Sequence, residues 1–133
     1  MKTIEVAAGL VFRDRKLLIT QRPADGHLPG LWEFPGGKRE PDEPFEDCLR
    51  RELKEELGIE VEVGELVESI THAYAEKTVH LKFFRCAWRQ HEPQPLGCPA
   101  FAWVDPTDLS DYEFPAADAQ LLEKLRRQHE LWR

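Results

Sequence analysis

The stretch EPDEPFEDCLRRELKEELG, residues 40–58, constrains the fold most strongly, because its apolar positions follow a helical period and those around it do not. Four apolar side chains recur every four residues and define one face of a helix: Phe45, Leu49, Leu53 and Leu57. We expect Asp42 or Glu43 to cap this helix and Pro44 to lie in its first turn. Gly58 is expected to end it, since glycine readily adopts the left-handed conformation of a helix C-terminus.

Strand-like stretches lie on both sides of this helix. Before it, TIEVAAGLVF and KLLITQR flank the charged turn RDRK, and the Pro- and Gly-rich loop PADGHLPGLW leads into a short strand, LWEFPGGK. After it come IEVEVGELVESITHAY, KTVHLKFFRCAW and FAWVD. A second helix is predicted over residues 116–132, with leucines at helical spacing: Leu121, Leu122, Leu125 and Leu131. This order predicts an α/β fold in which helices pack on the faces of a mixed sheet.

Size and composition limit the organisation of the chain. With 133 residues, we expect one domain spanning residues 1–133. Hydrophobic residues make up 41% and charged residues 32%, which excludes a disordered or a membrane-embedded chain. The first residues resemble a strand and not a signal peptide. The three cysteines are odd in number and lack the spacing of metal-binding pairs, so a reducing cytoplasm is the expected location.

Charge narrows the classes of partner. A net charge of −7 disfavours a protein that binds duplex nucleic acid directly. An acidic protein can still bind a phosphorylated small molecule when divalent cations lie between the two. Glu52, Glu55 and Glu56 fall on an arc of roughly 100° beside the apolar face of the helix. Such oxygen ligands suit Mg²⁺, although a solvated acidic face is the simpler interpretation of the cluster taken alone.

The spacing of residues around this cluster changes that balance. From Gly37 the chain reads G-x5-E-x7-R-E-L-x-E-E-x-G-I, and it ends at Ile59. This pattern resembles the complete signature of the Nudix hydrolases. The resemblance implies a Nudix fold, with a mixed sheet sandwiched between helices. It also implies hydrolysis of a nucleoside diphosphate linked to another group, with Mg²⁺ as cofactor and Mn²⁺ as a substitute.

The same resemblance assigns roles to individual residues. It implies that the metal is held by one helix and the glycine turn before it: Glu52, Glu55, Glu56 and Gly36. The expected catalytic residues are Glu55, Glu52, Arg51 and Glu43, with Arg51 orienting the carboxylates by charge-assisted hydrogen bonds. Lys38, beside the glycines, is expected either to contact a phosphate or to be a solvated loop lysine.

Outside the signature, the chain is similar from end to end to the MutT-like branch of the family. Three stretches carry this likeness: QRPADGHLPGLWEFPGGK, IEVAAGLVF and YEFPAADAQLLEKL. In that branch the position of Asp118 reads the base edge. Oxidised-guanine enzymes have asparagine there and CTP pyrophosphohydrolases have aspartate. An ionised Asp118 accepts two hydrogens from guanine or one from the cytosine amine; alternatively, it is a helix N-cap.

Other candidate substrate contacts each have an alternative. Arg22 is expected to bind a phosphate or to be a surface arginine. Aromatic residues are expected either to stack on the base or to pack in the core: Trp32, Phe34 and Tyr74. Phe114 and Pro115 are expected to line the same pocket. His27 is interpreted as a loop residue and not as a catalyst.

One departure from the branch concerns the general base. A glutamate is common six positions before the last-strand tryptophan, and here that position is Gly97. Glu92 and Glu76 are candidate substitutes, and Glu55 with Glu43 is a further possibility, so the general base stays open.

The expected partner is a nucleoside triphosphate, with 8-oxo-dGTP as first candidate and CTP, dCTP or a modified pyrimidine nucleotide as alternative. Neither membrane nor duplex nucleic acid is expected, and the protein is expected to be a monomer or a homodimer. Rival substrates are NADH, ADP-ribose and capped RNA. A rival of another class is a non-catalytic recognition module, which would not need the metal glutamates.

Overall fold

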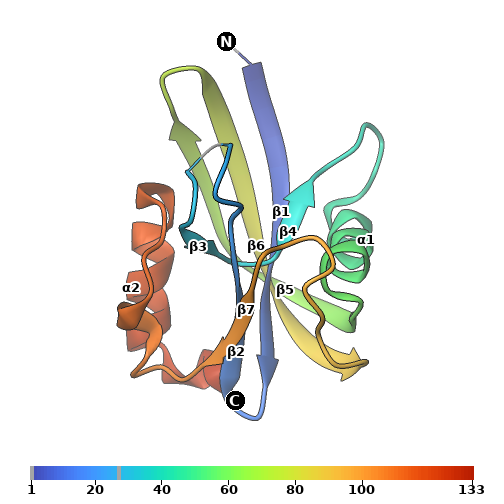
Figure 1. The fold of residues 1–133 in the computed structure, drawn as a ribbon, viewed down its shortest axis with the longest axis vertical. Helices are drawn as coiled ribbons and strands as arrows, with labels where there is room; N and C mark the ends of the chain where they lie inside the picture. Colours follow the sequence, from blue (N-terminus) through green and yellow to red (C-terminus); the bar gives the residue numbers. More distant parts are fainter. Residues whose placement is uncertain (1, 27) are drawn as a thin grey trace.

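The computed structural model describes residues 2–26 and 28–133, so the prediction for His27 lies outside the described residues. A mixed sheet lies between two helices, α1 and α2 (Figure 1). The strands are β1 (Lys2–Arg13), β2 (Lys16–Gln21), β3 (Trp32–Glu33), β4 (Gly36–Lys38), β5 (Glu60–Ala73), β6 (Lys77–Gln90) and β7 (Phe101–Val104). The helices are α1 (Phe45–Leu57) and α2 (Ala119–Arg127), with short 3₁₀ turns η1 (Leu109–Asp111), η2 (Ala116–Asp118) and η3 (His129–Trp132). The predicted α/β architecture is confirmed.

Strand β1 organises the sheet. One of its edges pairs in parallel with β6 along most of its length. Its other edge is divided, because β2 pairs only at the hairpin end and β4 pairs with Val6–Ala8. The Gly9 N–H donates to Pro35 O at 2.8 Å and continues the β4 side of this edge. Along this edge of β1, β4 takes the place of β2. The glycine turn, which is part of β4, therefore lies directly against β1.

The two faces of β1 serve different layers. Ala7 and Val11 pack with the apolar face of α1, whereas Ala8, Leu10 and Phe12 pack in the cluster that includes α2. This is the alternation expected of a strand covered on both sides. Among the described residues, no helix is long and apolar enough to cross a membrane.

Helix α1 follows the predicted apolar period, and Leu49, Leu53 and Leu57 are fully buried. Gly58 ends it in the left-handed conformation (φ 71°), as predicted, and donates its N–H to Lys54 O. The predicted cap by Asp42 or Glu43 is wrong. Pro44 occupies the N-cap position, and no side chain caps the helix.

Two further predictions need correction in their boundaries. The stretch LWEFPGGK forms two short strands, β3 and β4, because the chain passes from the edge of β2 to that of β1. The last helix ends at Arg127, and Leu131 lies in η3 instead. Leu131 and Trp132 are buried there, and Arg85 donates to Leu131 O at 3.0 Å. Contacts with distant residues therefore accompany the end of the helix before Leu131, although the spacing of the leucines predicted one longer helix.

Candidate active site

Arg51 pairs with several of the acidic side chains in the site. Its Nε donates to Glu43 Oε2 at 2.9 Å and its Nη2 to Glu43 Oε1 at 3.0 Å, a bidentate pair. Its Nη1 donates to Glu52 Oε2 at 2.8 Å and lies 3.6 Å from Glu55 Oε2. The hydrogen bond from Arg51 lowers the pKa of Glu43 to about 2. One guanidinium thus offsets the repulsion between neighbouring glutamates on α1.

The glycine turn lies directly against these carboxylates. A Cβ atom added to Gly37 would lie 2.3 Å from Glu52 Cδ, and one added to Gly36 would lie 2.0 Å from Ala7 O. Cys48, buried on α1, donates its thiol to Lys38 O at 3.5 Å. Glycine is required at Gly36, because a side chain there would push β4 away from β1, whereas a side chain at Gly37 would displace either Glu52 or β4.

Among the carboxyl groups of α1, Glu56 has the pKa that is raised most. Burial raises the pKa of its carboxyl to about 8, with further contributions from Glu33 and Glu52. The neighbouring Thr20 hydroxyl is buried without a partner at hydrogen-bond distance among the described residues. Burial also raises the pKa of Glu52, against the effect of Arg51.

This donor set fits a hard divalent cation, because every candidate ligand is an oxygen and several carboxylates repel one another. Within residues 2–26 and 28–133, no three His, Cys, Asp or Glu side chains are already arranged around one metal position. The Glu55 side chain is 62% exposed, so its carboxylate is accessible from the solvent.

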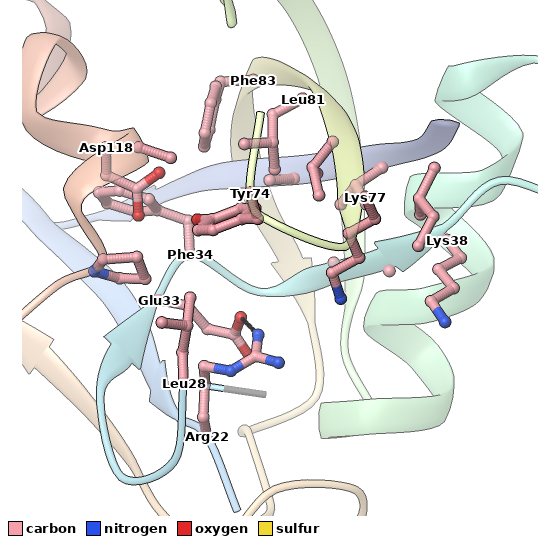
Figure 2. Close-up of a pocket in the computed structure, with 18 residues that line it drawn as sticks. Arg22, Leu28, Glu33, Phe34, Lys38, Tyr74, Lys77, Leu81, Phe83 and Asp118 are labelled. Carbon is pink, nitrogen blue, oxygen red and sulfur yellow. Dashed lines mark hydrogen bonds and ion pairs between the residues drawn. The ribbon is translucent and has the colours of Figure 1, made fainter. Parts of the chain in front are cut away.

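A pocket of about 250 Å³ lies on the other face of the sheet from α1, and we call it the sheet pocket. Its walls are mostly apolar and come from β1 and β6, with Val6, Leu81 and Phe83 among them. Gly36 and Gly37 line it as well, so the glycine turn separates the sheet pocket from the carboxylates of α1. Figure 2 shows Asp118 at one end and the amino groups of two lysines toward the other.

Asp118 is the buried acid of the sheet pocket. Its residue is 6% exposed, and no described residue donates a hydrogen bond to its carboxyl group. It occupies the N-cap position of α2 but makes no capping hydrogen bond, so the alternative role as a side-chain cap is not observed. Burial raises the pKa of Asp118 to about 7; Glu33 raises it further and Arg22 lowers it.

The other predicted pocket residues divide into two groups. Arg22, Phe34, Lys38, Tyr74 and Pro115 line the sheet pocket. Trp32 instead packs edge-on against Tyr112 with ring centroids 4.9 Å apart, and Phe114 stacks on Phe34 at 5.1 Å. Trp32 and Phe114 are not among the residues that line the pocket, and the alternative of core packing describes them better.

Two charged residues of the sheet pocket were missed from the sequence. Glu33 accepts a hydrogen bond from Arg22 Nη1 at 2.6 Å, and burial raises its pKa. Lys77 is the first residue of β6 and reaches the pocket because β6 pairs in parallel with β1. No local pattern in the sequence identifies Glu33 or Lys77 as part of the pocket.

Gly97, at the sequence position of the absent glutamate, lies against the end of α1. A Cβ atom on Gly97 would lie 3.3 Å from Glu56 Cα, and the Gly97 N–H donates to Glu56 O at 3.0 Å. Glu92 forms an ion pair with Arg13 at 2.6 Å, and Glu76 is exposed in the turn between β5 and β6. The structure brings neither candidate into the sheet pocket.

Comparison with known proteins identifies the family to which this chain is similar. A family model described as the NUDIX domain matches residues 7–124. The chain is 44% identical to a CTP pyrophosphohydrolase of Escherichia coli (strain K12), over 92% of this chain and 91% of the relative. It is 31% identical to an 8-oxo-dGTP diphosphatase of the same strain, over 96% and 99%. A structure solved in a study of MutT from Aliivibrio salmonicida and Vibrio cholerae superposes with a TM-score of 0.79, at 30% identity, and covers 94% of this chain and 97% of that one.

Proposed function

Because this chain belongs to the Nudix family of hydrolases, we propose that its site converts a (d)NTP and water into a (d)NMP and pyrophosphate. The protein is a Nudix nucleotide pyrophosphohydrolase, and members of this family generally need a divalent metal. Mg²⁺ is the proposed ion, with Mn²⁺ as a substitute. The observation that carries the proposal is the glycine turn, which lies between a set of carboxylates and an apolar pocket large enough to take a nucleobase.

The carboxylates are the proposed metal site. Glu52, Glu55 and Glu56 lie on α1, Gly37 lies against Glu52, and the backbone of the preceding Gly36 is the further proposed ligand. When bound, a divalent cation neutralises phosphate charge and lowers the pKa of water. Arg51 holds Glu43 and Glu52 in place, and Lys38 is the proposed contact for phosphate oxygens.

The proton of the attacking water needs an acceptor. Water forms a new bond to phosphorus, the bond from that phosphorus to the pyrophosphate oxygen breaks, and a carboxylate takes the proton. We assign this role to Glu55, which is exposed and only loosely paired with Arg51. Glu43 is a poor base, because both of its oxygens bind Arg51 and its pKa is about 2.

The base is proposed to lie in the sheet pocket against Asp118. An ionised carboxyl accepts two hydrogens from the N1–H and 2-amino group of guanine, an edge that 8-oxoguanine keeps. Cytosine offers its 4-amino group to the same carboxyl. We therefore propose two substrate classes, oxidised guanine nucleotides such as 8-oxo-dGTP and cytidine nucleotides. The relatives support this pair, since one is named for CTP and another for 8-oxo-dGTP.

The biological role proposed for the first class is removal of oxidised nucleotides from the pool before DNA replication. We propose the cytoplasm as the location of the reaction, because the free cysteines Cys48, Cys86 and Cys98 suit a reducing compartment. Neither duplex nucleic acid nor a membrane is required. We propose a monomer or a homodimer.

The test is a product analysis with 8-oxo-dGTP, dGTP, dCTP, CTP, NADH and ADP-ribose in the presence of Mg²⁺. We expect nucleoside monophosphate and pyrophosphate from the triphosphates, with 8-oxo-dGTP and the cytidine nucleotides ahead in kcat/KM. Release of orthophosphate, or faster turnover of NADH or ADP-ribose, would contradict the proposal. No turnover of any compound would favour the non-catalytic module.

A further inference from the structure

Thr20 is a polar residue in the interior of β2, where the residues before it are apolar. It is fully buried, as are Leu17, Leu18 and Ile19. Its hydroxyl oxygen is buried without a hydrogen-bond partner among the described residues. Such a hydroxyl group destabilises a folded protein, whereas valine has nearly the same shape and leaves no polar group unpaired. Packing of the core alone therefore does not account for a threonine at this position.

The position of Thr20 in the sheet directs its side chain toward α1. Side chains alternate along a strand, so Thr20 lies on the same face of β2 as Leu18. Leu18 packs in the cluster that contains the buried leucines of α1. Thr20 pairs with Glu33 of β3 on one side and with Phe101 of β7 on the other, so β2 is not an edge strand here. The hydroxyl group of Thr20 is a neighbour of the Glu56 carboxyl group on α1.

Glu56 lacks the ion pair that holds the other glutamates of α1. Arg51 donates to Glu52 at 2.8 Å and lies 3.6 Å from Glu55. Within residues 2–26 and 28–133, no arginine or lysine forms an ion pair with Glu56. Its backbone is fixed by the loop before β7, because the Gly97 N–H donates to Glu56 O at 3.0 Å. The direction of the Glu56 carboxylate therefore depends on the side chains packed around it.

We propose that Thr20 positions Glu56 for the metal: its hydroxyl group donates a hydrogen bond to the Glu56 carboxylate when that carboxylate binds the ion. A carboxylate only accepts hydrogen bonds, and a threonine hydroxyl group is able to donate one. Groups that hydrogen-bond to a metal ligand orient it, and their loss weakens metal binding. This inference rests on the proposed function, in which Glu56 is a ligand, and adds a residue that acts through Glu56 without touching the substrate.

The experiment measures Mn²⁺ binding to the nucleotide-free protein by electron paramagnetic resonance of the free ion. Thr20→Val removes the hydroxyl group at nearly constant shape. We expect its Kd for Mn²⁺ to rise about tenfold relative to wild type, because the ligand loses a hydrogen bond that orients it. Thr20→Ser keeps the hydroxyl group, so its Kd is expected to stay within about threefold of wild type.

Stability separates positioning from packing. In the absence of metal, Thr20→Val should resist urea at least as well as wild type, because it removes a buried hydroxyl group that has no partner. Thr20→Ser should be less stable, because it loses a buried methyl group. A purely structural role therefore predicts weaker Mn²⁺ binding in the serine variant, whereas positioning predicts it in the valine variant. Thr20→Ala compared with Thr20→Ser repeats the test in a smaller side chain, should the valine variant fail to fold.

Two further measurements locate the effect at the metal. The Mg²⁺ concentration for half-maximal rate should rise about tenfold in Thr20→Val, while KM for dCTP at saturating Mg²⁺ should change little. In a Glu56→Gln background, Thr20→Val should leave the Mn²⁺ affinity unchanged, because the hydroxyl group acts through the carboxylate that is already absent.

Equal Mn²⁺ affinity in wild type and Thr20→Val would overturn the role of Thr20, and so would equal losses in the valine and serine variants. In both cases the metal site on α1 would stand. Unchanged Mn²⁺ affinity in Glu56→Gln alone would contradict the proposed metal site itself, and the role of Thr20 would be overturned with it.

Discussion

The carboxylate face of α1 and the sheet pocket meet at Gly37, and they handle negative charge in different ways. Beside the carboxylates of α1, Arg51 offsets Glu52 and Glu43, which precedes the helix, through short hydrogen bonds, whereas burial raises the pKa of Glu56. In the sheet pocket Asp118 has no such cation, and burial shifts its pKa instead. The first arrangement is the proposed site for a metal and phosphates. In the second, burial raises the pKa of Asp118, which lies where the base is proposed to bind.

The largest effect is expected from Glu56→Gln. The amide keeps the shape of the buried side chain but removes a proposed metal ligand, so kcat should fall by about a thousandfold or more for every nucleotide. The dGTP/dCTP ratio should not change, because the sheet pocket is untouched. Glu46→Gln, in the first turn of α1, is the control and should keep kcat within about twofold. Steady-state kinetics with circular dichroism of each variant checks this.

Gly37→Ala is expected to have the next largest effect, because Gly37 lies between the carboxylates of α1 and the sheet pocket. The added Cβ would lie 2.3 Å from Glu52 Cδ, so either Glu52 or β4 must move. We expect kcat/KM to fall by about ten- to a hundredfold, since small displacements of catalytic groups are costly. Pyrophosphate release measures it. A variant with normal turnover would show that Glu52 does not need its present position.

Asp118→Asn sharpens the contrast through stability. The pKa of Asp118 is raised from 3.8 to about 7, so the folded state keeps its proton between these values while the unfolded state loses it. Stability therefore falls as pH rises from about 4 to about 7 and stays low above. The variant should lack this loss and gain roughly 2 kcal/mol relative to wild type between pH 5 and pH 8.5. Urea titrations at both pH values test it; an equal difference at both would contradict it.

The smallest effect is expected from Lys77→Met. Lys77 lines the sheet pocket, and removal of its charge should raise KM for triphosphates by about three- to tenfold with kcat unchanged. The increase should shrink at high ionic strength, because salt screens the lost attraction. Lys16→Met, on the exposed start of β2, is the matched control. An unchanged KM would place Lys77 outside the substrate path.

The sequence predicted α1 well, because that information is local. A four-residue period identifies the buried leucines, and a fixed spacing identifies Arg51 and the glutamates. The cap was wrong, since Glu43 binds Arg51 and Pro44 takes its place. No local pattern predicted that Lys77 lines the sheet pocket, because its position depends on the parallel pairing of β1 and β6. Burial of Asp118 was equally invisible, because it arises from packing between distant elements.

The most direct test of this account compares kcat/KM for 8-oxo-dGTP, dGTP, dCTP and CTP among wild type, Glu56→Gln and Asp118→Asn, at fixed Mg²⁺ and pH. We expect Glu56→Gln to lower all four values by a similar factor and to keep their order. Asp118→Asn is expected to change the order while pyrophosphate release continues. If Glu56→Gln reorders the substrates, or if Asp118→Asn lowers all four equally, the division into a metal site on α1 and a base site in the sheet pocket is contradicted.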